Sequence, residues 1–180
     1  MPLYQMRKFV APELIFGVGA RHRAGFYAQH LQARRVLVVT DPGVIQAGWL
    51  QQLLVDLDEC GLQWVVFSDI TPNPKDHQVM VGSQVYRDQN CDVIVALGGG
   101  SVIDCAKGIG IVSANGGYIL DFEGVDQIPA PGPPLICIPT TAGTAADISQ
   151  FAIINNTEQR CKVSIISKSV VPDVALIDPE

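Results

Sequence analysis

Hydrophobic and polar positions alternate along residues 34–141 in the pattern of an α/β protein. Short, uniformly apolar runs predict four strands, at 34–41, 62–70, 91–100 and 133–141. Between and after them, apolar residues spaced three and four apart predict helices, over 42–61, 74–90 and from Ser101 onward. Apolar strands that alternate with helices are typical of a parallel sheet, so we expect one with helices on both faces.

The flanking segments extend this pattern. Residues 14–31 predict a short strand, a glycine turn and a helix, and residues 173–179 predict a last short strand. Two apolar runs within 151–167, separated by a polar turn at 155–159, predict a C-terminal β-hairpin. A chain of 180 residues fits one such domain, which we expect to span residues 1–180.

Composition narrows the classes of partner. The formal net charge is −6 and no cluster of Lys and Arg interrupts the acidic balance, which argues against binding to nucleic acid. No apolar run approaches the roughly 20 residues of a membrane span, and the N-terminus has no secretory pattern. We therefore expect a cytoplasmic protein with a small-molecule partner and no membrane partner.

The ends of the predicted strands carry the candidate chemistry. In parallel sheets, ligands bind at the carboxyl ends of the strands. The first strand ends at Asp41, for which two roles are open: to bind ribose hydroxyls, or to cap the following helix. The third ends in Gly99, Gly100 and Ser101, where bare backbone and a helix N-terminus suit a phosphate. This order differs from the usual G-x-G-x-x-G fingerprint, in which the glycines precede the acidic residue.

Other polar residues near these strand ends have simpler explanations. Ser101 and Asp104 match a capping box, which would explain Asp104 by helix geometry, and we expect structural roles for both Asp104 and Lys107. After the fourth strand, hydroxyls gather at Thr140, Thr141, Thr144 and Ser149. The histidines lack metal-ligand spacing and are interpreted as helix-face residues; they are His22, His30 and His77. The cysteines are interpreted as reduced filling residues; they are Cys60, Cys91, Cys105, Cys137 and Cys161.

Three long motifs give the chain a family resemblance. "ALGGGSVIDCAKGIGIVSANGG", "YILDFEGVD" and "IPTTAGTAADISQFAII" resemble the iron-containing (group III) alcohol dehydrogenases in order and spacing. The resemblance implies a Rossmann-like domain that binds NAD or NADP, followed by an all-helical domain whose Asp and three His hold Fe²⁺ or Zn²⁺. In that family a small alcohol or aldehyde reacts between the domains.

The resemblance also assigns residues. It implies that Asp41 holds the adenosine ribose and favours NAD, that Asn73 contacts the cofactor, and that Gly99, Gly100 and Ser101 seat the pyrophosphate. It places Thr140 and Thr141 along the diphosphate and nicotinamide, and Phe151 and Lys162 at further cofactor contacts. Ser149 stands where many relatives have Thr. With Thr144, these are the expected cofactor-binding residues; no catalytic residue and no metal ligand is assigned.

Several expectations follow from the resemblance. The metal ligands would belong to the helical domain, which these 180 residues do not include, so we expect them to bind NAD without oxidising alcohol. A homodimer through the segment 7–17 is also expected. Two alternatives stay open: a non-catalytic nucleotide-binding or interaction module, and the glycerol dehydrogenase branch.

Overall fold

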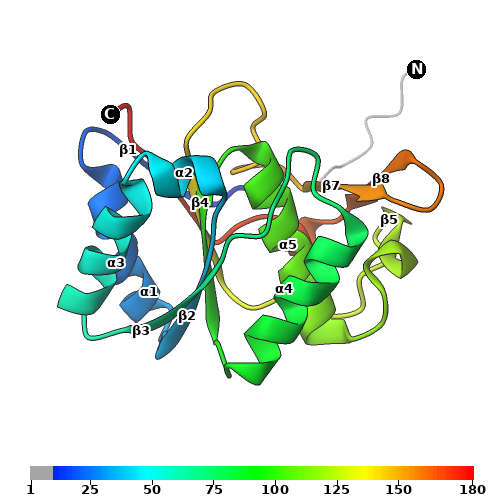
Figure 1. Cartoon of the computed structure of the whole chain (residues 1–180), viewed down its shortest axis with the longest axis horizontal. Helices are drawn as coiled ribbons and strands as arrows, with labels where there is room; N and C mark the ends of the chain where they lie inside the picture. The colour runs from blue at the N-terminus through cyan, green and yellow to red at the C-terminus, as the bar shows by residue number, and fades with distance from the viewer. Residues whose placement is uncertain (1–9) are drawn as a thin grey trace, which may run out of the picture.

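The computed structural model describes residues 10–180, and its chain is drawn in Figure 1. The strands are β1 Glu13–Phe16, β2 Arg35–Val39, β3 Gln63–Phe67, β4 Val93–Gly98, β5 Gly124–Val125, β6 Leu135–Pro139, β7 Phe151–Asn156, β8 Cys161–Ile166 and β9 Val174–Ile177. The α-helices are α1 Ala24–His30, α2 Pro42–Gln46, α3 Trp49–Glu59, α4 Asp76–Asp88 and α5 Gly100–Asn115. Short 3₁₀ helices are η1 Ala20–Arg23, η2 Ile119–Phe122 and η3 Lys168–Val170.

Six strands form one parallel sheet in the order β1-β9-β6-β4-β2-β3. This confirms the predicted α/β fold, including the short flanking strands at both ends of the pattern. Figure 1 shows the helices divided between the two faces, with α1 and α3 on one and α4 and α5 on the other. The expectation of a sheet covered on both faces is therefore confirmed.

The side chains of β2 show why the strands are uniformly apolar. Val36 and Val38 are buried in the cluster beneath α1 and α3, whereas Leu37 and Val39 are buried in the cluster beneath α4 and α5. Successive residues of a strand point to opposite faces, so a sheet covered twice needs apolar residues at every position. The core thus consists of two layers, one on each face.

The order of the strands places a topological switch point between β2 and β4. The chain runs from β2 outward to β3 and then returns to the other side of β2 as β4. The Thr40 hydroxyl, which is buried, donates to the Leu97 carbonyl oxygen at 2.8 Å and joins the two strand ends. In open α/β sheets this crevice is where ligands bind.

A second, smaller sheet contains the predicted hairpin. Its order is β5-β8-β7, with β7 and β8 antiparallel. The hairpin is confirmed, but its turn occupies residues 157–160 instead of 155–159. Asn155 and Asn156 still pair with Lys162 and Cys161, so the strand continues into residues whose type favours a turn.

The single helix predicted over 42–61 is wrong: the structure has two helices there. Gly48 has φ 82°, a left-handed conformation that ends the first helical segment before α3 begins at Trp49. The predicted end is confirmed, because Gly61 has φ 67° and its N–H donates to the carbonyl oxygen of Asp58.

No helix of the described residues is long and apolar enough to span a membrane.

The segment predicted for dimer formation lies partly outside the described residues, which begin at Val10. Within them, β1 forms one edge of the large sheet. Its residue Phe16 is 75% exposed, and Val18, just beyond the strand, is 70% exposed. The homodimer itself stays a prediction.

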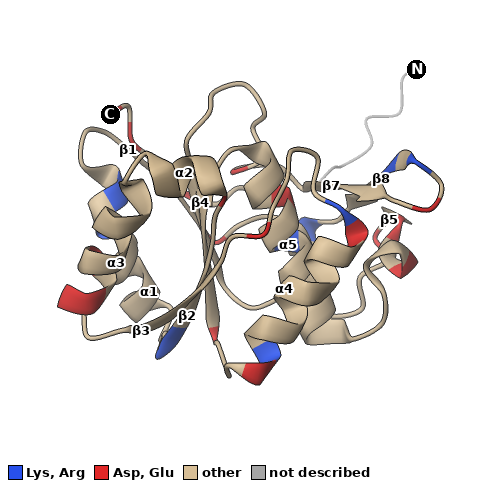
Figure 2. Ribbon diagram, in the orientation of Figure 1, with Lys and Arg blue, Asp and Glu red and all other residues tan. Residues whose placement is uncertain are grey.

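Lys and Arg are scattered among Asp and Glu over the ribbon (Figure 2).

Close packing between α4 and α5 gives a test of the fold. A Cβ atom at Gly82 would overlap Ile109 Cδ1 and lie 3.0 Å from Phe67 Cε1. We expect Gly82→Ala to lower the free energy of unfolding by about 1–3 kcal/mol, because the added methyl overpacks the core. Urea denaturation measures the change.

The matched control for this substitution is Gly110→Ala in α5. Its added Cβ would meet Pro133 at 3.5 Å, an ordinary contact, so stability should stay within about 1 kcal/mol of the original or rise. Equal stabilities of the two variants would contradict the packing described here.

Candidate functional site

Two adjoining cavities lie at the carboxyl edge of the large sheet, and together they contain every residue that the sequence assigns to cofactor binding. The first cavity, of about 730 Å³, contains Asp41, Gly99, Gly100, Ser101, Thr140 and Thr141. The second cavity, of about 620 Å³, contains Asn73, Gly100, Ser101, Thr144, Ser149, Phe151 and Lys162. Because Gly100 and Ser101 border both, the cavities meet at the first turn of α5.

The N-terminus of α5 supplies free hydrogen-bond donors at this junction. No side chain caps the helix, whose N-cap residue is Gly99. The N–H groups of Val102 and Ile103 donate to the Gly99 carbonyl oxygen, while those of Gly100 and Ser101 donate to no described residue. A helix of sixteen residues with free N–H groups at its start is suited to bind an anion.

The predicted capping box of Ser101 and Asp104 is wrong. The helix begins at Gly100, so Ser101 already lies inside it and cannot be the N-cap residue. The Ser101 hydroxyl instead accepts a hydrogen bond from the backbone N–H of Asn73 at 3.1 Å. This bond draws the loop between β3 and α4 to the start of α5, which brings two predicted cofactor residues together.

Close contacts with neighbouring side chains account for two of the glycines of "GGGS", Gly99 and Gly100. Neither Gly99 nor Gly100 has a positive φ, so backbone freedom does not explain them. A Cβ atom at Gly99 would meet Thr141 Oγ1 at 3.2 Å, and one at Gly100 would meet Thr144 Cγ2 at 2.9 Å. The bare backbone therefore lets two threonine side chains lie directly against the start of α5.

For Asp41 the structure shows the capping role directly. Its Oδ1 atom accepts hydrogen bonds from the N–H groups of Gly43 at 2.8 Å and Val44 at 3.0 Å, as the N-cap of α2. The side chain is only half-buried and lines the first cavity. The two roles considered for Asp41 are compatible, because the capping bonds use one carboxylate oxygen.

Asp104 was not assigned to the site, yet it lines the second cavity. It follows Gly100 by one turn on the same face of α5. This spacing in the sequence is the signal from which its place in the site could have been predicted. Burial raises the pKa of Asp104 to about 6, against the opposing effects of Lys107, the Ile153 N–H group and Lys162. A carboxyl group thus titrates near neutral pH within the wall of the cavity.

Lys107 ties the rim of the second cavity to α5. Its side chain is 3% exposed, and Nζ donates to the carbonyl oxygens of Ser149 at 2.7 Å and Phe151 at 2.8 Å. Burial lowers the pKa of this ammonium, while the nearby Asp104 and Asp147 act in the opposite direction. The structural role predicted for Lys107 is confirmed.

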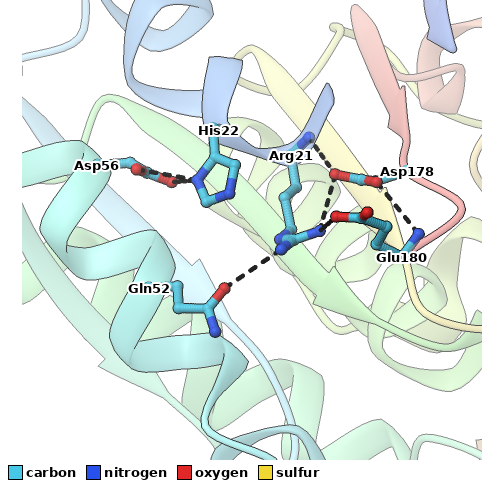
Figure 3. A network of polar contacts seen from close by, with 6 residues as sticks. All are labelled: Arg21, His22, Gln52, Asp56, Asp178 and Glu180. Carbon is cyan, nitrogen blue, oxygen red and sulfur yellow. Dashed lines mark hydrogen bonds and ion pairs between the residues drawn. The ribbon is translucent and has the colours of Figure 1, made fainter. Parts of the chain in front are cut away.

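A third cavity, not predicted from the sequence, adjoins the first and shares Trp49, Thr140 and Thr141 with it. One side of it carries the polar network drawn in Figure 3. Arg21 donates to Asp178 Oδ2 through its backbone N–H at 3.2 Å and Nη1 at 3.0 Å, and His22 Nδ1 lies 2.9 Å from Asp56 Oδ2. The network joins η1, α3 and the residues after β9.

The histidine and cysteine side chains discussed above do not line either of the two cavities. His77 Nδ1 is 3.5 Å from Asp76 Oδ1 at the start of α4, and all five cysteines are free thiols. Three of the cysteines are buried, which fits the prediction of filling residues. Within residues 10–180, no group of three or more His, Cys, Asp or Glu is arranged to hold a metal ion.

The fold and the site define a doubly wound α/β domain with free helix N–H groups at its switch point, an arrangement typical of nucleotide-binding proteins. A family profile described as iron-containing alcohol dehydrogenase matches residues 11–179. The chain therefore belongs to the iron-containing alcohol dehydrogenase family, as the resemblance of the motifs implies.

Individual relatives support the same assignment. The chain is 37% identical over 172 residues to the NAD-dependent methanol dehydrogenase of Bacillus methanolicus, a match covering 96% of this chain and 45% of that protein. The structure of a 1,3-propanediol oxidoreductase matches with TM-score 0.94 and 36% identity, covering 97% of this chain and 46% of the other.

A sulfoacetaldehyde reductase from Bifidobacterium kashiwanohense, whose structure is in complex with NAD⁺, matches with TM-score 0.89 and 28% identity over 97% of this chain and 46% of the other. The chain thus spans less than half the length of these relatives. The alternatives of a non-catalytic module and of the glycerol dehydrogenase branch are not favoured by these similarities.

The raised pKa of Asp104 predicts a pH dependence of stability. The folded-state pKa of about 6 lies above the ordinary value of about 3.9, so the folded state holds the proton more tightly. Protonated Asp104 makes its full contribution to the free energy of unfolding below about pH 4. This contribution is lost as the pH rises through 6 and the buried carboxyl group ionises. Relative to Asp104→Asn, the original protein should therefore lose on the order of 1–3 kcal/mol of unfolding free energy from pH 4 to pH 7.

Urea denaturation of both proteins at several pH values measures this difference. Asp69→Asn, which removes an exposed carboxylate outside the cavities, controls for the change in net charge. A constant difference between the original protein and Asp104→Asn across this range would contradict the assignment of Asp104 to a desolvated wall.

Proposed function

We propose that this chain binds NAD as the cofactor domain, residues 1–180, of a metal-dependent alcohol dehydrogenase. One observation carries the proposal: two cavities meet at the uncapped N-terminus of α5, at the switch point of the sheet. A dinucleotide has two nucleoside ends joined by a pyrophosphate. Two cavities with an anion-binding helix terminus between them match that shape and charge.

The residues present fit such a ligand along its length. At one end, the free oxygen of Asp41 is suited to accept hydrogen bonds from ribose hydroxyls and to repel a 2′-phosphate, which supports NAD over NADP. In the middle, the N–H groups of Gly100 and Ser101 and the hydroxyls of Thr141 and Thr144 suit phosphate oxygens.

The second cavity is then the place of the nicotinamide half. Ser149, Phe151 and Lys162 line it, and Lys107 fixes the carbonyl groups of the first two. When bound, the nicotinamide supplies the hydride-accepting chemistry of alcohol oxidation. In this proposal the chain's own residues bind and orient that ring.

The rest of the activity rests on the family relationship. We propose that a small alcohol or aldehyde and the Fe²⁺ or Zn²⁺ that polarises its oxygen belong to a helical part of the family architecture outside these 180 residues. The 180 residues by themselves are then expected to bind NAD without oxidising alcohol. A cytoplasmic location and a homodimer also stay predictions.

Titration calorimetry with NAD tests the proposed site. We expect saturable binding by the 180-residue chain, and about a tenfold weaker affinity for Gly100→Ala, because the added methyl would displace Thr144 and cover the free N–H groups. Gly110→Ala, a matched change further along α5, should bind NAD normally. Absence of binding at millimolar NAD, or equal affinity in Gly100→Ala, would contradict the proposal.

The two roles of Asp41 can be separated by two substitutions. Asp41→Asn keeps a capping oxygen and removes the charge, so NADP should gain about tenfold relative to NAD with little change in stability. Asp41→Ala removes the cap as well and should cost about 1 kcal/mol of unfolding free energy. Competition titrations and thermal denaturation measure these effects; an unchanged NAD to NADP ratio in both variants would exclude the ribose role.

A further inference from the structure

Trp49 occupies an unusual place beside the proposed site. It is the first residue of α3, directly after the left-handed Gly48, and 37% of its surface is exposed. Its side chain borders both the first cavity and the third cavity. The family resemblance assigns no role to this residue.

Aromatic side chains are scarce around the site. Among the described residues, only Trp49 and Phe151 are aromatic and line any of the three cavities. Trp49 lies in the cavity that contains Asp41, and Phe151 in the cavity that contains Lys162. One flat apolar ring is thus present at each end of a site proposed for a ligand with two aromatic bases.

The short helix α2 sets the relation between Trp49 and Asp41. Asp41 caps its start, and Gly48, two residues beyond its end, turns the chain so that α3 begins with Trp49. Both side chains line the same cavity. In adenosine, the base is one glycosidic bond from the ribose, so a ring that borders the ribose-binding cavity is within reach of the base.

We propose that the Trp49 indole stacks on the adenine ring of the bound dinucleotide. This inference rests on the proposed function, since it requires the adenosine half to lie in the first cavity. Stacking on an indole face removes apolar surface of both rings from water. The broad indole also allows the offset arrangement that aromatic pairs prefer. Trp49 is then the residue that distinguishes the adenosine end from the nicotinamide end.

The second tryptophan of the chain provides an internal control. Trp64 in β3 is also exposed, but its Nε1 donates to Asp58 at 2.8 Å and it lines none of the three cavities. In Trp64→Phe, Trp49 is the single tryptophan and its fluorescence reports on its own surroundings. We expect AMP to quench this fluorescence saturably and nicotinamide mononucleotide to leave it unchanged.

Substitutions of Trp49 test the energetic contribution. Trp49→Leu keeps an apolar side chain without a ring and should weaken AMP and NAD about tenfold, the size of one base–aromatic stack, while nicotinamide mononucleotide binds as before. Trp49→Phe keeps a ring and should remain within about threefold of the original. Circular dichroism confirms that each variant is folded.

The outcomes separate the inference from the function on which it rests. If the original chain binds neither NAD nor AMP at millimolar concentration, the proposed function fails and the inference fails with it. If NAD binds but AMP leaves Trp49 fluorescence unchanged, or Trp49→Leu binds AMP normally, the stacking role alone is overturned. Should Trp49→Leu not fold, the fluorescence titration of Trp64→Phe still decides.

Discussion

The contact between the start of α5 and the segment that follows β6 is the constraint on which the site depends. Two glycines without side chains allow Thr141 and Thr144 to lie against the helix terminus, and two turns along the helix Lys107 holds the carbonyl groups of Ser149 and Phe151. A Cβ atom at either glycine would lie within 3.2 Å of a threonine side chain, so a larger residue there requires the threonine to shift. The two cavities meet at this contact, because Gly100 and Ser101 line both.

The fold was predictable because its strands are buried on both faces, and the edge that carries the candidate site follows from parallel topology. From the sequence alone, the same rule places Asp41, Gly99 and Thr140 at one edge, since all three lie at the ends of strands of the same sheet. The register of β2, β4 and β6 places their carboxyl ends at this edge.

What the sequence could not predict depended on single residues. A lone Gly48 in an amphipathic run is tolerated by many helices, so its left-handed conformation was not evident. The capping box failed because the helix starts at Gly100, one residue earlier than expected, and Asp104 lines a cavity instead. Beside the third cavity, Arg21 donates a hydrogen bond to Asp178, which lies 157 positions away in the sequence. No local sequence pattern predicts a contact over such a separation.

The buried ammonium of Lys107 also connects the segment before β7 to α5. The uncapped N-terminus, the Asp104 wall and the Lys107 anchor for the segment before β7 all belong to α5, so one helix joins these parts of the site. Asp41 belongs to a different layer, because α2 packs with α3 toward the opposite face of the sheet. A ligand that spans both cavities would therefore contact both layers of the domain.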